Sequence, residues 1–274
     1  RLQQDYISEV AEINDYYKAY EKGMDFNTEG TNGEYIPSDV RFKKAASIIN
    51  KEARFLFSNP PTFNVNVDDV KGDLADDNSI LQEYLDKVLQ KNNFNVQIIK
   101  AIKDCFIGKR VAIVLNFNSD SEEISLTFLS SLEFIFKMAN DNSNKLEKFI
   151  CFHNTVTTSD RAKQIWFKKV YYLLNGSVYV SEHYYDGLGN LLTDMPSIDD
   201  MKTDLTDIPA VVILNDGLIG DTKGRSELAG LLQEEAVYSK LANADIDVER
   251  KGMNPVAYTI DAASNSTENL TRSP

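Results

Sequence analysis

Hydrophobic residues recur at helical spacing through the first part of the chain. One apolar stripe begins at Tyr6 and stops before Gly23, and a second runs from Phe42 to Phe57. Two more stripes follow over residues 80–89 and 94–106. Apolar positions separated by three or four residues predict amphipathic helices, and a glycine after the last of them is a typical helix end. The sequence therefore predicts a group of N-terminal helices, with a short strand over residues 63–67 between the second and third.

From Val111 onward apolar and polar residues alternate, which is the period of a half-buried strand. Strand patterns cover residues 111–117, 124–129, 132–138, 149–153, 165–174, 178–185 and 208–215. The dipeptide Asn175-Gly176 separates two of these runs and Asp186-Gly187 follows one. Both favour tight hairpin turns, because Asn, Asp and Gly accept positive φ. The predicted fold class is α+β, with N-terminal helices, a mostly antiparallel sheet and then a long C-terminal helix.

The predicted C-terminal helix runs from Ser226 to Lys251 and has apolar residues on two sides of a helical wheel. The first side carries Val237, Leu241, Ala244 and Val248. The opposite side carries Leu228, Leu231, Leu232, Ala242 and Ile246. An ordinary surface helix buries one stripe, so two stripes predict contacts on both sides, as in a bundle or a ring of identical helices.

Polar residues fill the two intervening faces of this helix. One face is acidic and carries Glu227, Glu234, Asp245 and Glu249. The other has no net formal charge and carries Gln233, Lys240, Asp247 and Lys251. Arg250 and Lys251 lie in the last turn, where cations interact favourably with the helix dipole.

Composition narrows the classes of function. The chain has 274 residues, 42% of them hydrophobic, which is enough for one or two folded domains. Its formal net charge of −13 argues against tight binding of nucleic acid, which depends on cationic side chains. The longest apolar run, residues 208–214, is far shorter than the roughly 20 residues that cross a bilayer. The two cysteines form no CxxC pair, which fits a reducing compartment.

Catalytic and metal-binding motifs are weak in this sequence. The two histidines, His153 and His183, have no partner at metal-ligand spacing. Two groups of aspartates could hold a hard cation, one over residues 68–77 and one over residues 194–207. Neither matches a calcium-binding loop, and Asp-rich solvated connections explain both. We therefore expect no metal site and no cofactor, and a two-metal nuclease that uses these aspartates is a minor alternative.

A series of motifs in order along the chain resembles the portal proteins of tailed double-stranded DNA bacteriophages, in the branch common among siphophages of Gram-positive hosts. These motifs are Ile208-Pro209-Ala210-Val211-Val212 with Asn215, Gly224-Arg225-Ser226-Glu227-Leu228, Asn243-Ala244-Asp245-Ile246 and Lys251-Gly252-Met253-Asn254-Pro255. The tyrosine-rich first helix and the helix ending at Phe57-Ser58-Asn59-Pro60 also look like the family's N-terminal wing. Two departures from the family pattern are mild. The family often has Gly where Asn59 stands, and Asn also tolerates left-handed φ. It frequently has Asp where Glu227 stands, and Glu keeps the negative charge.

The resemblance implies a structural protein that is not an enzyme, a subunit of a dodecameric ring at one capsid vertex. Residues 1–215 would form the wing, residues 216–252 a loop and the first stem helix, and residues 253–274 the start of the clip. The ring would be the channel for DNA packaging and ejection and would connect head and tail. Its expected partners are copies of itself, the terminase large subunit, a head-tail adaptor, scaffolding and major capsid proteins, and double-stranded DNA passing with low affinity. Assembly would take place in the host cytoplasm and the product would belong to the virion.

The resemblance also gives roles to the faces of the C-terminal helix. The acidic residues Glu227, Glu234, Asp245 and Glu249 become candidates for the channel lining, because like-charged walls repel phosphate. The stem-packing candidates are Leu228, Leu231, Leu232, Val237, Leu241, Ala244, Ile246 and Val248. Arg250 and Lys251 are candidate contacts for DNA or the packaging motor. The wheel leaves open which polar face lines the channel, and a non-portal phage interaction module remains the main alternative.

Overall fold

The computed structural model describes residues 2–23, 41–59, 61–65, 75–118, 123–139, 145–160, 163–216, 221 and 223–253. Its helices are α1 (Leu2–Lys22), α2 (Lys44–Leu56), α3 (Ala75–Lys91), α4 (Phe94–Gly108) and α5 (Leu232–Met253). Its strands are β1 (Arg110–Asn118), β2 (Glu123–Ser130), β3 (Phe134–Met138), β4 (Leu146–Val156), β5 (Ile165–Leu174), β6 (Ser177–Asp186), β7 (Ile198–Lys202) and β8 (Ala210–Leu214). The α+β class with N-terminal helices is confirmed.

The strands form two antiparallel sheets where the sequence predicted one. One sheet has three strands in the order β2-β1-β8, and the other has five in the order β3-β4-β5-β6-β7. The hairpin between β5 and β6 turns at Asn175 and Gly176, whose φ angles are 52° and 78°, so the predicted tight turn is confirmed. All pairings between the described strands are antiparallel.

The main core lies between the two sheets. The three-stranded sheet contributes Ala112, Val114 and Leu129, and the five-stranded sheet contributes large rings such as Phe134 and Phe149, which are fully buried. Phe134 and Phe149 stack with centroids 5.6 Å apart. Alternation along β1 and β4 turns every second side chain into this space, so each sheet presents one apolar face to the other.

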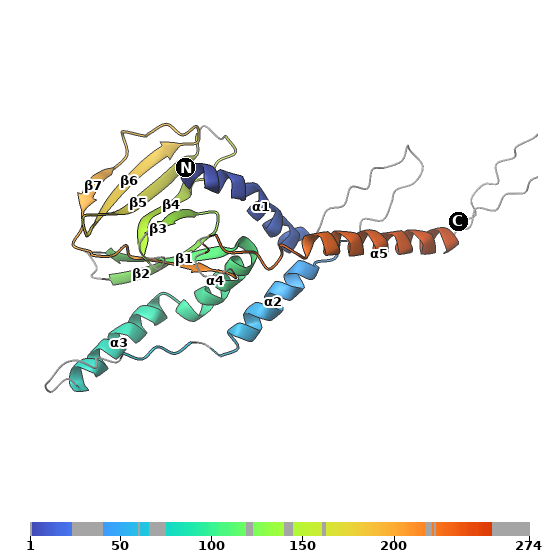
Figure 1. Ribbon diagram of the computed structural model, residues 1–274, viewed down its shortest axis with the longest axis horizontal. Helices are drawn as coiled ribbons and strands as arrows, with labels where there is room; N and C mark the ends of the chain where they lie inside the picture. The colour runs from blue at the N-terminus through green and yellow to red at the C-terminus, as the bar shows by residue number, and fades with distance from the viewer. Residues whose placement is uncertain are drawn as a thin grey trace, which may run out of the picture.

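Helices form a third layer against the three-stranded sheet (Figure 1). On that side Ala101 and Cys105 of α4 pack against Val111 of β1. Helices α1 and α2 join α4 through a second cluster that contains Tyr16, Ile49 and Ile107. The body is thus a five-stranded sheet, a three-stranded sheet and a helical layer, and its last element, α5, leaves the end where α1, α2 and α4 meet (Figure 1).

Several predicted boundaries are corrected by the structure. Residues 61–65 are not a strand, although Gln82 of α3 holds them by accepting from Val65 N–H and donating to the Phe63 carbonyl. Strand β3 begins at Phe134, two residues late, because residues 131–133 form the turn from β2. Strand β7 was not predicted. None of the described helices is long and apolar enough to cross a membrane.

Candidate functional site

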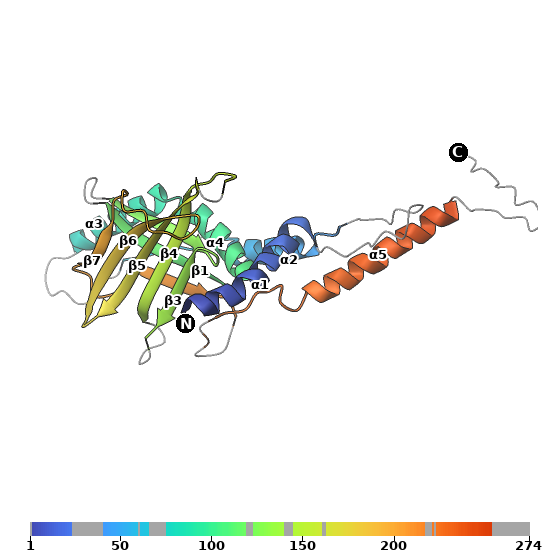
Figure 2. The ribbon, with the colours of Figure 1, turned by 90° about the horizontal axis from the view of Figure 1, so that it is seen from above.

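Helix α5 extends away from the layered body in both views of the chain (Figures 1 and 2). It begins at Leu232, whereas the sequence predicted a helix from Ser226. Residues 227–231 form a turn that packs on the body, and Leu228 there is fully buried with Leu231 and Leu232 beside it. The single wheel drawn over residues 226–251 is therefore wrong for Glu227, Leu228 and Leu231, and it holds from Leu232 onward.

The first turns of α5 are fastened to the start of α2. The Glu235 carboxylate accepts a hydrogen bond of 2.9 Å from the Lys44 backbone N–H, the first residue of α2. A carboxylate is favourable there because unpaired N–H groups give a helix N-terminus partial positive charge. The Lys44 ammonium lies 4.2 Å from the ring centre of Tyr238, and the Phe42 ring meets that ring edge-on at 5.4 Å. These contacts fix one side of α5 against α2.

The segment before α5 is locked to the C-terminus of α4. Ser226 Oγ donates to the Phe106 carbonyl at 3.1 Å and Glu227 N–H donates to the same oxygen at 2.9 Å. Asn215 Nδ2 donates both to the Arg225 carbonyl and to the Glu227 carboxylate, at 2.8 and 3.0 Å. The first two bonds satisfy the Phe106 carbonyl, one of those that the end of α4 leaves free, and all four hold the segment that leads into α5 on the body.

Gly224 is required in this joint. Its φ of +67° is a conformation that L residues rarely adopt, and a Cβ there would lie 2.4 Å from the Lys109 carbonyl oxygen. The close approach lets Asn215 N–H donate to the same Lys109 carbonyl at 2.8 Å. Any other residue at position 224 would separate these backbones.

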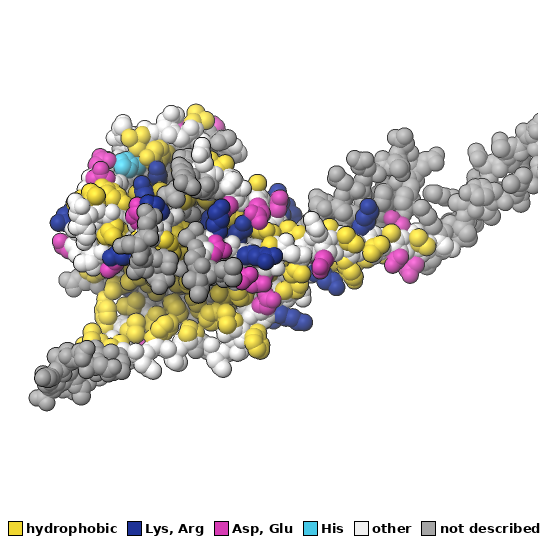
Figure 3. Space-filling model, viewed as in Figure 1, with side chains coloured by type: hydrophobic (Ala, Val, Ile, Leu, Met, Phe, Trp, Pro, Cys, Tyr) yellow, Lys and Arg dark blue, Asp and Glu magenta, His cyan; other side chains and the backbone are white. Residues whose placement is uncertain are grey.

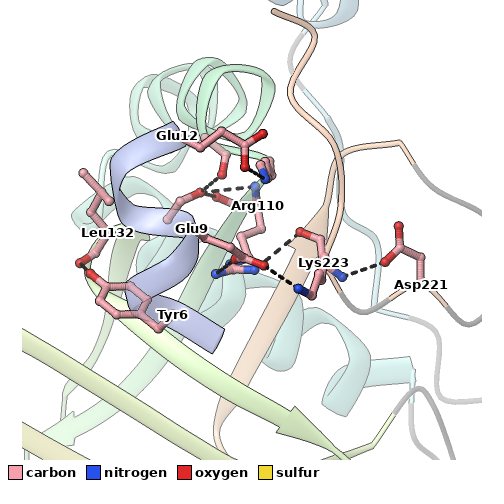
Figure 4. Close-up of polar contacts among 10 residues, drawn as sticks. Tyr6, Glu9, Glu12, Arg110, Leu132, Asp221 and Lys223 are labelled. Carbon is pink, nitrogen blue, oxygen red and sulfur yellow. Dashed lines mark hydrogen bonds and ion pairs between the residues drawn. The ribbon is translucent and has the colours of Figure 1, made fainter. Parts of the chain in front are cut away.

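A buried ion-pair cluster secures the same joint from the side of α1 (Figure 4). Arg110 at the start of β1 contacts the Glu9 carboxylate at 2.9 Å, and the two side chains are only 6 and 9% exposed. Lys223 reaches the other oxygen of Glu9 at 3.1 Å, so one carboxylate ties α1 to β1 and to the segment before α5. A charge buried to this degree is tolerated only when it is paired, so each partner depends on the others.

A second pair lies one helical turn further along α1. Lys109 Nζ contacts the Glu12 carboxylate at 2.7 Å, and Tyr16 donates to the same carboxylate at 2.6 Å. These two hydrogen bonds, with the Lys109 bond the larger cause, lower the pKa of Glu12 below its ordinary value. The carboxylate is therefore held in its charged form next to the joint.

The outer side of α5 is apolar and exposed. Val237, Leu241 and Val248 are 58, 62 and 68% exposed, and Ala244 between them is exposed as well. The opposite side is buried at Glu235, Ser239 and Asn243 and half-buried at Ala242 and Ile246. The first apolar stripe of the predicted wheel thus faces solvent in the single chain.

The predicted charged residues of α5 also lie on its surface. Glu234, Asp245 and Glu249 are exposed on one flank of the apolar stripe. Glu227 is separate from them, half-buried in the turn where Asn215 binds it. Arg250 is exposed in the last turns of α5, and the side chain of Lys251 is outside the described part of the chain.

The aspartate groups form no metal centre in the described residues, where no three acidic, histidine or cysteine side chains are close enough to hold an ion. In the second group, Asp199 contacts His183 at 2.7 Å, Asp200 accepts from Ser181 at 2.7 Å, and Asp207 pairs with Lys145 at 2.8 Å. The first group lies mainly outside the described residues. The nuclease alternative therefore gains no support.

Sequence reasoning missed the buried ion-pair cluster. Glu9 lies on the same side of α1 as the buried Ile13 and Tyr16, so a charge on a core-facing stripe was the signal that could have revealed it. Nothing in the sequence identified Arg110 as its partner, because the two residues come together only when α1 crosses the start of β1.

Comparison of this chain with known proteins identifies the family to which it belongs. The family model described as phage portal protein, SPP1 Gp6-like, matches residues 3–217, which span α1 to β8. No curated protein matches the chain. The matched region ends just before the joint at Gly224, so it covers the layered body and leaves out α5. Because the match extends over most of the 274 residues, the chain belongs to the SPP1 Gp6-like phage portal protein family.

Proposed function

We propose that this chain is the wing and the first stem helix of a portal ring at one capsid vertex. The portal family is a structural family of the virion capsid, and its members assemble as oligomers with phage head proteins. In this proposal the ring is a dodecamer that forms the channel for DNA packaging and ejection and connects head to tail. The observation that carries it is a projecting α5 with an exposed apolar stripe on a body of the portal family.

The apolar stripe of α5 fits a neighbouring helix. Its members Val237, Leu241, Ala244 and Val248 are separated by four, three and four residues, which is the spacing that packs helices side by side. We assign these four residues to contact with α5 of the adjacent subunit. Leu228, Leu231 and Leu232 pack within the same subunit, and Ile246 lies half-buried on the inner side of α5.

The acidic flank of α5 is assigned to the channel. Glu234, Asp245 and Glu249 would face passing DNA, and a wall of like charge keeps the duplex from adhering. Glu227 is left out of this set, because its carboxylate is bound to Asn215 in the joint. Arg250 and Lys251, at the end of α5, are assigned to DNA phosphate or the packaging motor.

The remaining partners follow from the same proposal. The terminase large subunit would drive DNA through the ring, a head-tail adaptor would close it, and scaffolding and major capsid proteins would surround it. Assembly would occur in the host cytoplasm before the portal becomes part of the virion.

Ring formation is tested by native mass spectrometry of the full-length protein, with negative-stain electron microscopy to look for a central hole. The wild-type protein should form closed rings, and Leu241→Asp with Val248→Asp should leave folded monomers, because two charges would enter the helix contact. The matched control is Lys240→Ala, an exposed change on another side of α5, which should keep the ring. A stable wild-type monomer or dimer, even with scaffolding protein present, would contradict the portal ring and favour an interaction module.

The channel assignment has its own test. Glu234→Lys with Asp245→Lys should leave rings intact but slow packaging or retain DNA, because lysines would attract phosphate. Gln233→Lys adds a lysine at the neighbouring position on the other polar face and should package normally. Unchanged packaging by the double variant in intact rings would remove these residues from the channel wall.

A further inference from the structure

Helix α2 presents a basic face to solvent. Its buried side, formed by Ala45, Ile49 and Ala53, packs on the body. At about 100° per residue around the helix, the residues of the opposite side fall within an arc of about 100°. We call this side the basic face, and its members are Lys44, Ser47, Lys51, Arg54 and Phe55, with Lys43 before them at the N-cap. All of them are exposed, and Figure 3 shows Lys and Arg side chains projecting from the region of α2.

The cations of the basic face form no salt bridges in the part of the chain that the structure describes. Lys43, Lys51 and Arg54 take part in none of the ion pairs found there. The Lys44 ammonium lies 4.2 Å from the centre of the Tyr238 ring, which is a contact without opposite charge. The positive charge of this face is therefore not balanced by carboxylates.

The only acid of α2 lies away from the basic face. Glu52 is on the border of the helix that is turned toward the joint, where desolvation and the charge of Glu227 raise the pKa of its carboxyl. On a helical wheel it lies about 60° beyond Phe55 and about 100° from Lys51. An uncompensated positive surface therefore runs along α2, in a chain whose net charge is −13. Such a local reversal of sign is complementary to an anionic partner.

An aromatic ring borders the cations. Phe55 is 86% exposed, more than any other large hydrophobic side chain in the described ranges, and it follows Lys51 by one helical turn. Aromatic and arginine side chains are enriched at the centres of protein interfaces. Phosphates, by contrast, are bound by cations, hydroxyls and N–H groups, and they give a phenyl ring no apolar partner. The ring next to the cations therefore favours a protein partner over duplex DNA.

The length of the basic face leads to the same conclusion. A helix of 13 residues is about 20 Å long, so the positive charges occupy one short patch. Duplex DNA carries about one charge per 1.7 Å of its length, and it would continue past the ends of α2 over a chain of net charge −13. A short acidic helix would meet the basic face alone. Carboxylates that recur every three or four residues along such a helix match the intervals between Lys44, Lys51 and Arg54.

We infer that the basic face of α2 binds an acidic amphipathic segment of another protein. The carboxylates of that segment pair with Lys43, Lys51 and Arg54, and one of its apolar side chains covers the Phe55 ring. The site is separate from the stem contact of the proposed ring, because it uses no residue of the apolar stripe of α5. It therefore goes beyond the proposed function, and either can fail without the other.

Binding is tested with the full-length protein and a fluorescein-labelled peptide as the probe. The peptide is a helix of Glu, Ala and Leu, with its leucines on one side at intervals of three and four residues. Fluorescence anisotropy at physiological salt should show saturable binding to the wild-type protein. A peptide of equal charge with serine in place of leucine should bind about tenfold more weakly, because it leaves the Phe55 ring uncovered. Phe55→Ser should give the same loss with the leucine peptide, and it should keep the wild-type urea midpoint because the ring is 86% exposed.

Charge reversal tests the cations. Lys51→Glu with Arg54→Glu should lower the affinity for the leucine peptide at least about tenfold, because two attractions become repulsions. The matched control is Lys163→Glu with Lys202→Glu, which makes the same change of net charge at exposed positions before β5 and in β7. This control should bind the peptide as the wild-type protein does. An equal loss in the control would mean that overall charge attracts the peptide, and it would overturn the inference.

Two further measurements test other occupants of the basic face. A short labelled DNA duplex should bind more weakly than the leucine peptide. Tighter binding of the duplex, lost in Lys51→Glu with Arg54→Glu, would make this face a nucleic-acid surface and overturn the inference. Native mass spectrometry should find the same assembly for this variant as for the wild-type protein. Loss of a wild-type ring in the variant would assign the face to contact between copies, and it would overturn the inference as well.

The outcomes separate this inference from the proposed function. Peptide binding by a wild-type protein that forms no ring would overturn the portal ring and leave the acidic partner standing. Wild-type rings that do not bind the leucine peptide would overturn the acidic partner and leave the portal ring standing.

Discussion

The layered body and helix α5 differ in how much of their apolar and charged surface is buried within the single chain. The body encloses Phe134, Phe149 and Ile49 completely, and it buries its own ion pairs between Glu9, Arg110 and Lys223. Helix α5 leaves Val237, Leu241 and Val248 more than half exposed. Among its described residues only Leu232, at its first position, packs against an apolar core cluster.

This difference indicates where each region obtains its stability. A helix of 22 residues in water is held mainly by tertiary packing of its apolar side, and α5 lacks that packing on its outer stripe. The body buries its core within the single chain, whereas the outer stripe of α5 stays exposed there. Between the two regions, the joint at Asn215 and Gly224 holds the segment that leads into α5 on the body.

The change that we expect to destabilise the body most is removal of the Glu9 carboxylate, which Arg110 and Lys223 share. Glu9→Ala should lower the free energy of unfolding by about 3–5 kcal/mol, because Arg110 would remain buried with no carboxylate beside it. Urea unfolding followed by far-UV circular dichroism measures this loss. Asp15→Ala, which removes the exposed pair with Lys18, is the matched control and should leave the urea midpoint nearly unchanged. Equal midpoints for the two variants would show that the buried cluster does not hold the body.

A pair of truncations compares the two regions directly. Ile49→Ala should cost about 2–5 kcal/mol, because it opens a cavity in the cluster between α1, α2 and α4. Leu241→Ala removes an aliphatic side chain that is 62% exposed, and it should change the unfolding of the monomer very little. In the proposed ring the second variant should become the damaging one, at the contact between neighbouring α5 helices. A large monomer effect of Leu241→Ala would mean that α5 is packed within its own subunit.

Local sequence patterns predicted the elements whose partners are close along the chain. The stripes from Tyr6 and Phe42 gave α1 and α2, and the turn at Asn175 gave the β5–β6 hairpin, because periodicity and turn chemistry act within a few residues. Strand β7 was missed because four of its five residues are exposed and acidic or basic residues dominate it.

The features of the fold that the sequence did not predict depend on contacts between residues far apart along the chain. The separation into two sheets depends on which faces meet across the core, and a period of two does not carry that information. The late start of α5 depends on the Phe106 carbonyl, which binds Ser226 and Glu227 from the end of α4. Among the site residues, Glu234, Asp245 and Glu249 are exposed and their channel role stays a prediction, whereas the wheel assigned Glu227 to a helix that begins later.

The smallest effect we expect concerns the pH dependence of the joint. The pKa of Glu12 is lowered in the folded chain by its hydrogen bonds from Lys109 and Tyr16, so the unfolded chain binds a proton there more readily. The stabilisation is therefore present above the unfolded pKa of about 4.3 and is lost as the pH falls through the lower folded value. Since the Glu12 side chain is 49% exposed, solvent screening keeps the contribution below about 1 kcal/mol.

Glu12→Gln isolates this contribution, because the amide keeps the shape of the side chain and cannot titrate. Between pH 5 and pH 3 the stability of the variant should fall less steeply than that of the wild-type chain. Glu21→Gln, which removes an exposed carboxylate further along α1, is the matched control. Urea midpoints at half-unit pH steps provide the two slopes. A Glu12→Gln slope equal to that of the wild-type chain would show that the hydrogen bonds to Glu12 do not set the acid sensitivity of this region.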